Sequence, residues 1–201
     1  MSAPSPVRLR LAGAPERWHA LGFEPEDDGS IRLGALALSF VAGDGGLVGW
    51  SLSTAGALAQ PADIDGIQTT WEPALPPAPG RCTVDHIVVL TPCRSRTVAA
   101  LQAVGMRLRR ERETERMRQA FFRHGEAVVE VVQPRTKPVE EGGKAPARLW
   151  GLTLSVDDLD AIAARLGPVL GPISDAVQPG RRIVTVRREA GLGTALALMS
   201  A

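Results

Sequence analysis

The sequence predicts an α+β fold made of βαβββ modules, because one order of elements is written three times along the chain. Each copy has a β-type run, a short amphipathic helix closed by glycine, and further β-type runs. In the middle copy the run VDHIVVL precedes a helix whose apolar residues Val98, Leu101 and Val104 recur at helical spacing. Gly105 then supplies the helix stop.

The last copy repeats this order. The run LWGLTLSV precedes DDLDAIAARLG, in which Asp157 or Asp158 can cap the helix and Gly167 ends it. The first copy has PVRLRLA, then APERWHALGF with Pro15 in the first turn and Gly22 as the stop. We therefore expect modules at 1–58, 82–135 and 148–201.

Two stretches need a structural interpretation, one rich in proline and one rich in charge. Residues 59–81 contain IQTTWEPALPPAPGR, which predicts an extended linker between the N-terminal module and a pair of modules spanning 82–201. The run RLRRERETERMRQ has good helix formers, but its place in the repeat favours a solvated β-hairpin.

Composition restricts the class of protein. The chain has 201 residues, of which 44% are hydrophobic and 22% charged, and its net charge of +1 gives no electrostatic case for nucleic-acid binding. No apolar stretch approaches the roughly 20 residues of a membrane span, and the N-terminus lacks a signal-peptide pattern. Cys82 and Cys93 lie at opposite ends of one apolar run, too far apart for a disulfide along a strand. Free thiols and a cytoplasmic location are the expectation.

Alternation along the strands selects two candidate functional residues. His86 shares one face of its strand with Val88, and Glu130 shares one face of its strand with Val128. If the first and last strands of the middle module are neighbours, the imidazole and the carboxylate converge on one wall of a cleft. Such a pair can bind a divalent metal, act in proton transfer, or simply form a hydrogen bond in a ligand pocket.

Three further residues are candidates for substrate binding. Gln119 falls either in the cleft or on a surface hairpin. Arg182, or its neighbour Arg181, can grip an anionic substrate, although a turn with a solvated arginine is favoured. Trp150 can form a cleft wall, although ordinary core is favoured. The sequence has no phosphate loop, no GxSxG and no CxxC.

The segments VDHIVVLTP, AFFRHGEAVVEVVQP, LWGLTLSVDDLDAIA and GLGTALALMS together resemble the vicinal oxygen chelate superfamily. This superfamily includes glyoxalase I, extradiol dioxygenases and the bleomycin resistance proteins. The resemblance implies the glyoxalase/bleomycin resistance/dihydroxybiphenyl dioxygenase fold over the last 120 residues or so, preceded by a degenerate N-terminal module. More narrowly, RQAFFRHG and DAVQPGRRIVTVR are similar to bacterial proteins called glyoxalase-like.

The resemblance also implies a metal site, with ligands on the first and last strands of each module. His86 and Glu130 match those positions in the middle module, while Gly151 and Ala197 take them in the last module and cannot bind a metal. The ligand set for a divalent ion such as Fe, Zn, Ni or Mn is thus incomplete. The implied functions are a metal-dependent lyase, isomerase or dioxygenase acting on a small organic substrate, or a metal-independent binding or sequestering protein. A homodimer is expected by resemblance alone.

Overall fold

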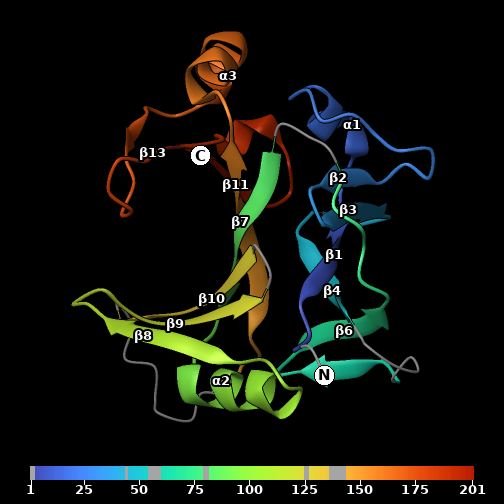
Figure 1. The fold of residues 1–201 in the computed structure, drawn as a ribbon, viewed down its shortest axis with the longest axis vertical. Helices are drawn as coiled ribbons and strands as arrows, with labels where there is room; N and C mark the ends of the chain where they lie inside the picture. Colours follow the sequence, from blue (N-terminus) through green and yellow to red (C-terminus); the bar gives the residue numbers. More distant parts are fainter. Residues whose placement is uncertain (1–2, 44, 54–59, 79–81, 125–126, 136–143) are drawn as a thin grey trace.

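The computed structural model describes residues 3–43, 45–53, 60–78, 82–124, 127–135 and 144–201. Its strands form two mixed sheets, of six and of eight strands, and its helices are few and short (Figure 1). The predicted α+β class with paired βαβββ modules is confirmed.

The eight-stranded sheet contains the two predicted modules side by side. Its strands are β7 (Cys82–Leu90), β8 (Leu108–Glu113), β9 (Met117–His124), β10 (Ala127–Pro134), β11 (Arg148–Val156), β12 (Ser174–Asp175), β13 (Arg182–Thr185) and β14 (Ala195–Ser200). They lie in the order β12-β13-β14-β11-β7-β10-β9-β8. In each module the first strand pairs in parallel with the last, β7 with β10 and β11 with β14, and the antiparallel pair β7–β11 joins the modules. The charged run predicted as a hairpin forms β8 and β9.

Each module has one helix packed on the same side of this sheet. The helices are α2 (Arg94–Ala103) and α3 (Leu159–Leu166), and short 3-10 turns follow at Gly167–Val169 and Arg188–Ala190. The Asp158 carboxylate accepts a hydrogen bond from the Ala161 N–H at 2.9 Å and caps α3 as predicted. The two helices lie at opposite ends of the molecule (Figure 1).

The six-stranded sheet corrects the expected linker. It consists of β1 (Pro6–Ala12), β2 (Ile31–Leu33), β3 (Leu36–Val41), β4 (Leu47–Ser53), β5 (Ala62–Ile64) and β6 (Ile67–Glu72), with α1 (Pro15–His19) at one end. Strands β5 and β6 fall inside the range 59–81, and β6 pairs in parallel with β4. The hairpin between them turns at Asp65 and Gly66, whose φ angles of 53° and 92° are both positive. An Asp-Gly pair is a standard hairpin signal, which the proline-rich composition of the segment concealed.

Buried side chains explain why β5 and β6 form strands and not an extended linker. Ile64 and Ile67 are each 2% exposed, and the buried indole N–H of Trp50 donates to the Thr69 hydroxyl at 2.8 Å. The described parts of the linker that lie outside the strands and their turn are 60–61 and 73–78, while residues 59 and 79–81 lie outside the described residues.

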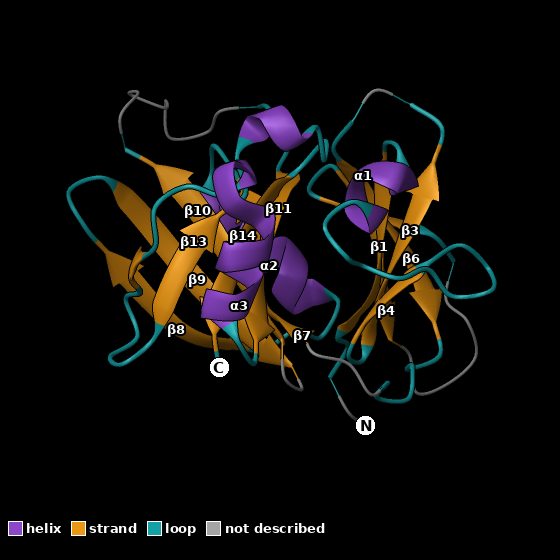
Figure 2. Ribbon diagram, turned by 90° about the horizontal axis from the view of Figure 1, so that it is seen from above, coloured by secondary structure: helices purple, strands orange, loops and turns teal. Residues whose placement is uncertain are grey.

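One apolar core spans both sheets. Buried residues of the six-stranded sheet, such as Trp50 and Leu52, belong to the same cluster as Ile87 and Leu154 of the eight-stranded sheet. Strand β4 lies against β11, and the sheets form two adjacent lobes (Figure 2). The concave face of the eight-stranded sheet is turned away from the N-terminal lobe (Figure 1).

Candidate functional site

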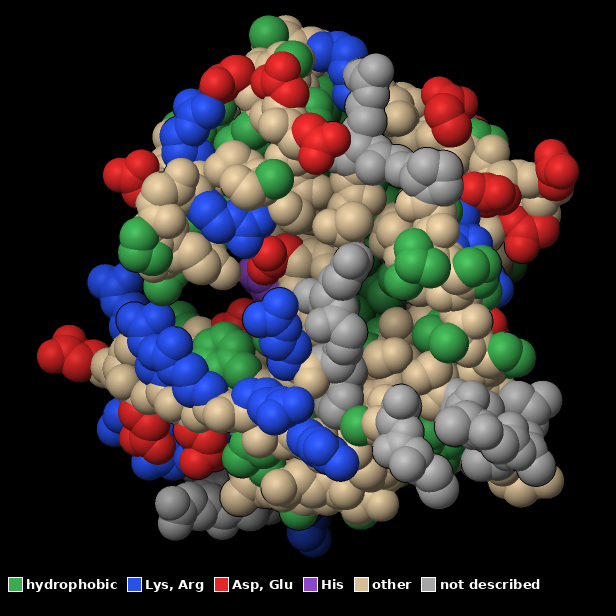
Figure 3. All heavy atoms as spheres, viewed as in Figure 1, with side chains coloured by type: hydrophobic (Ala, Val, Ile, Leu, Met, Phe, Trp, Pro, Cys, Tyr) green, Lys and Arg blue, Asp and Glu red, His purple; other side chains and the backbone are tan. Residues whose placement is uncertain are grey.

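The structure brings His86 and Glu130 together on the concave face of the eight-stranded sheet. His86 lies on β7 and Glu130 on the neighbouring β10, and the imidazole Nε2 is 3.8 Å from the carboxylate Oε2. Their side chains are 21% and 14% exposed, so both are partly buried yet accessible. A hollow on this side of the molecule has a histidine and acidic side chains at its edge (Figure 3).

A β-bulge in β7 adds Asp85 to this face. His86 pairs with Thr153 of β11, but the next pairing joins Val84 to Leu154, so Asp85 is the extra residue. Val84 and Ile87 both point into the core, which leaves Asp85 and His86 together on the opposite face. Strict alternation would have placed Asp85 away from His86.

Asp85 holds the imidazole in one orientation. Its Oδ1 lies 3.0 Å from His86 Nδ1, and its Oδ2 accepts a hydrogen bond at 2.7 Å from Arg181 Nη1. Burial raises the pKa of Asp85, but the hydrogen bonds from His86 and Arg181 outweigh it and leave the pKa below its usual value. An ionised Asp85 accepts a hydrogen bond from Nδ1–H, which makes Nε2 the basic nitrogen of the neutral ring.

Arg181 is itself fixed by two further contacts. Its Nη2 donates to the Ser155 hydroxyl at 2.9 Å, and its Nε donates to the Ser200 carbonyl at 2.6 Å. The guanidinium is therefore a structural brace for Asp85, and it leaves the carboxylate little freedom to rotate.

The groups around Nε2 come from three strands. The Thr153 hydroxyl on β11 lies 3.0 Å from His86 Nε2. On the other side, the Gln119 amide on β9 donates to Glu130 Oε1 at 2.5 Å. Gln119, one of the predicted substrate-binding residues, thus lies on the concave face, where it orients Glu130.

Trp150 and Arg182, the other two candidates for substrate binding, lie on different sides of the sheet. Trp150 is the extra residue of a second bulge, in β11, and is 44% exposed, so the preference for ordinary core was wrong. The register places it with Gly151 on the concave side. Arg182 lies on the α3 side of β13, where it pairs with Asp160 at 2.7 Å, so it does not reach this site. Adjacent residues of a strand point to opposite faces, and it is Arg181 that faces Asp85.

The described donors do not fit a resident divalent metal. Zinc and iron sites need three or more protein ligands, and no group of three or more His, Cys, Asp or Glu side chains with suitable placement exists among the described residues. His86 Nδ1 and Nε2 and both Glu130 oxygens already have partners. The positions related by the repeat, Gly151 and Ala197, carry no donor side chain.

Sequence reasoning missed Asp85 and Thr153 as members of the site. Thr153 was visible as a polar residue on the correct face, opposite Leu152 and Leu154, but nothing linked it to His86 until the β7–β11 register was known. Asp85 had no signal except its place beside His86.

Two hollows lie away from this face. One of about 810 Å³ is lined by α3, by the loop that includes Phe23, and by Arg32 of β2. Another, of about 650 Å³, lies beside Cys93 and Arg94 at the start of α2. Cys82 and Cys93 are free thiols, as expected, and no described helix is long and apolar enough to cross a membrane.

Comparison with known proteins agrees with this architecture. Residues 85–167 match the family model described as the Glyoxalase/Bleomycin resistance protein/Dioxygenase superfamily, which confirms the resemblance seen in the sequence. No curated protein matches the chain.

The chain is also similar to solved structures, and in three of these the match covers 91–96% of the other chain. A hypothetical protein from Bacillus halodurans C-125 is 12% identical, with a TM-score of 0.49, and covers 61% of this chain and 96% of its own. Methylmalonyl-CoA epimerase from Mycobacterium tuberculosis is 21% identical, with a TM-score of 0.46 and coverages of 61% and 91%. A methylmalonyl-CoA epimerase in complex with methylmalonyl-CoA and NH4+ is 18% identical, with a TM-score of 0.47 and coverages of 59% and 93%.

Proposed function

We propose that the concave face binds a small organic substrate and moves a proton on it. Residues 85–167 of the chain match the glyoxalase, bleomycin resistance and dioxygenase superfamily. The observation that carries this proposal is the chain of contacts from Arg181 through Asp85 to His86. General base catalysis requires a base that is oriented by a second group and accessible to substrate, and His86, oriented by Asp85 and 21% exposed, meets both conditions.

In this reaction His86 Nε2 takes a proton from a carbon next to a carbonyl group. The electron pair of the broken C–H bond moves onto the carbonyl oxygen and gives an enolate. Delivery of a proton to the opposite face of the same carbon completes an epimerisation, and delivery to a neighbouring carbon completes an isomerisation. Glu130 then acts in the second proton transfer, a role supported by its distance of 3.8 Å from Nε2.

Proton exchange with solvent tests this function directly. 2-Oxo and 3-oxo carboxylic acids are incubated with the protein in D2O, and loss of the signal of the proton beside the carbonyl is followed by NMR. General acid–base groups contribute about 10²–10⁴-fold, so His86→Gln should slow exchange at least about a hundredfold. The matched control is His19→Gln, because His19 is an exposed histidine of α1. Equal exchange rates in the wild type and His86→Gln would remove the proposal.

A metal-dependent reaction keeps one supporting observation, namely that Nε2 and Oε2 are close enough to contact one ion. Elemental analysis of the purified protein, with the double variant His86→Ala, Glu130→Ala as the comparison, tests it. Stoichiometric metal that disappears in the double variant supports the metal site, and unchanged metal content contradicts it.

A metal-independent binding or sequestering protein is the second candidate. The observation that favours it is Gly151 and Ala197 at the positions where the resemblance requires donors. Tight binding of a small organic molecule without any proton exchange would favour this function over the enzyme.

A further inference from the structure

The side chains of the concave face form rows that cross the sheet from strand to strand. The first row consists of Arg123, Val128, His86, Thr153, Ala197 and Thr185. The second consists of Arg110, Phe121, Glu130, Val88, Gly151 and Ala195. The third consists of Arg112, Gln119, Val132, Leu90 and Arg148. All three rows end in an arginine on the β8–β9 side.

These arginines have no acidic neighbour to neutralise them. Arg110, Arg112, Arg123 and Arg148 are all exposed, and among the described residues no hydrogen bond or ion pair joins any of them to a side chain or carbonyl. Basic side chains gather along β8 and β9 beside the hollow (Figure 3).

The acidic residues of the same strand lie on its other face. Glu111 and Glu113 of β8 point toward α2, where both pair with Arg94. The acids of the concave face are also engaged, Asp85 by Arg181 and Glu130 by Gln119. Strand β8 therefore separates its charges, with paired acids on the helix side and unpaired bases on the concave side.

We propose that the three arginines of the β8–β9 end, Arg110, Arg112 and Arg123, bind an oxyanion group of the substrate, a carboxylate or a phosphate. Guanidinium groups grip such oxygens through paired hydrogen bonds, and three like charges on one face gain most from a ligand that neutralises them. Arg123 and His86 lie in the same row two strands apart, a spacing of roughly 10 Å. The substrate is then an anionic molecule that reaches from a charged end at β8–β9 to a reacting carbon at His86. The position of the reacting carbon rests on the proposed function, but the anion site does not.

Titration calorimetry with inorganic pyrophosphate and with citrate tests the anion site. Each probe is titrated at low salt and again at about 150 mM salt, where screening weakens exposed charge contacts. Loss of one exposed guanidinium should raise Kd about fivefold in Arg110→Gln and in Arg123→Gln. Tighter binding of pyrophosphate than of citrate indicates a phosphate group, and the reverse indicates a carboxylate.

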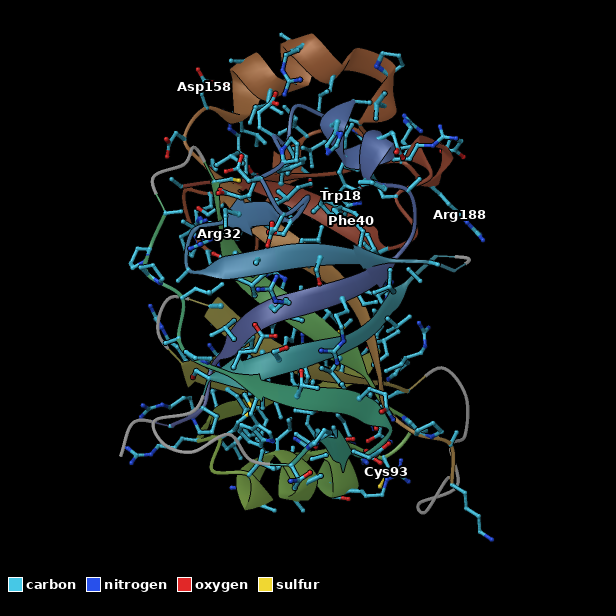
Figure 4. The ribbon with its side chains drawn as sticks, turned by 90° about the vertical axis from the view of Figure 1, so that its right-hand side faces the viewer. Trp18, Arg32, Phe40, Cys93, Asp158 and Arg188 are labelled. Atoms are coloured by element: carbon cyan, nitrogen blue, oxygen red, sulfur yellow. The ribbon has the colours of Figure 1, made fainter. Side chains whose placement is uncertain are left out.

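Arg188→Gln is the matched control, since it also removes one exposed positive charge. Arg188 projects away from the body of the molecule, far from α2 and Cys93 (Figure 4). Its substitution should leave Kd unchanged, and so should His86→Gln, because the anion binds at the other end of the row.

Three results would overturn the anion site. The first is no binding of either probe by the wild type, and the second is an equal loss of affinity in Arg188→Gln. The third is tighter binding of a short single-stranded oligonucleotide than of either probe, which would indicate that the natural ligand is a nucleic acid and not a small molecule. Anion binding without proton exchange would reject the proposed reaction alone, and exchange without anion binding would reject this inference alone.

Discussion

A single glycine on β11 decides what chemistry the second module can hold. A Cβ at Gly151 would lie 2.6 Å from the carbonyl oxygen of Ala195 and 2.8 Å from its Cβ. Because the backbone of β14 supplies one of those atoms, no side-chain rotation relieves the contact. A metal ligand at this position would have to separate two central strands of the sheet.

We expect Gly151→Ala to lower the free energy of unfolding by about 1–3 kcal/mol, the usual cost of overpacking. Urea denaturation followed by circular dichroism measures the change. Gly13→Ala is the control, because the nearest atom to its Cβ would be 3.8 Å away. An equal effect of the two substitutions would contradict the close approach of β11 and β14.

Asp85 should make stability depend on pH in a defined direction. Its pKa in the folded protein is lowered, so its contribution is complete above the unfolded value of about 3.9 and is lost as pH falls through the folded value. Wild type and Asp85→Asn should therefore differ in unfolding free energy by about 1–3 kcal/mol at neutral pH, and the difference should shrink in acid.

Asp160→Asn provides the comparison for Asp85→Asn. Asp160 also pairs with an arginine, but its side chain is 65% exposed, so solvent screens the pair and little pH-dependent difference is expected. Denaturation curves at pH 3 to 8 give both differences. A gap between wild type and Asp85→Asn that grew on acidification would show that the sign is wrong.

Alternation along the strands predicted which face His86 and Glu130 share, because a two-residue period is imposed by the backbone itself. It could not predict Asp85 or Trp150, since each is the extra residue of a bulge. A bulge depends on the pairing of two strands distant in sequence, and neither strand shows it alone. Arg181 and Arg182 show the same limit, because only the register of β13 with β14 tells which of them faces the site.

At the scale of elements, helices and central strands were predictable and the hairpin of β5 and β6 was not. The helices carry their own caps and stops, such as Asp158 and Gly105. Strands β5 and β6 are short and adjoin a proline-rich segment, so composition outweighed the Asp-Gly turn. Their apolar residues acquire partners only when β6 pairs with β4.

Thr69→Val should reveal β6 as part of the core. The substitution keeps the shape of the side chain but removes the acceptor of the Trp50 indole N–H, which is buried. We expect a loss of about 1–3 kcal/mol in unfolding free energy, the cost of an unsatisfied buried donor. Ala74→Ser, in the exposed segment 73–78, should have no measurable effect. Equal stability of Thr69→Val and wild type would restore the linker interpretation.

At the scale of the whole molecule, the six-stranded sheet repeats the plan of the eight-stranded one. Its central antiparallel pair is β1–β4, and each of these strands has a parallel neighbour, β3 and β6. Gly49 corresponds to Gly151, because a Cβ there would lie 2.7 Å from the carbonyl oxygen of Gln68 on the adjacent strand. We infer that the N-terminal module is itself a reduced pair spanning residues 6–72, longer than the range 1–58 expected from the sequence.

The continuous core predicts that both sheets unfold together. In a Trp150→Phe variant the remaining tryptophans, Trp18, Trp50 and Trp71, report on the N-terminal lobe by fluorescence, and amide exchange at Val129 and Val131 reports on the other sheet. In urea the two signals should have the same midpoint. Midpoints that differ by more than experimental error would show that the sheets are independent folding units.

The turn at Asp65 also fastens the two lobes to each other. Its carboxylate accepts hydrogen bonds from Arg96 at 2.6 Å and from Thr97 at 2.5 Å, both in the first turn of α2, and its carbonyl accepts one from the Ala147 N–H at 2.7 Å. The β5–β6 turn of the N-terminal lobe therefore anchors α2, the helix that lies beneath β8 and β9. Displacement of the N-terminal lobe would move α2 and, with it, the strands that carry Arg110, Arg112 and Arg123.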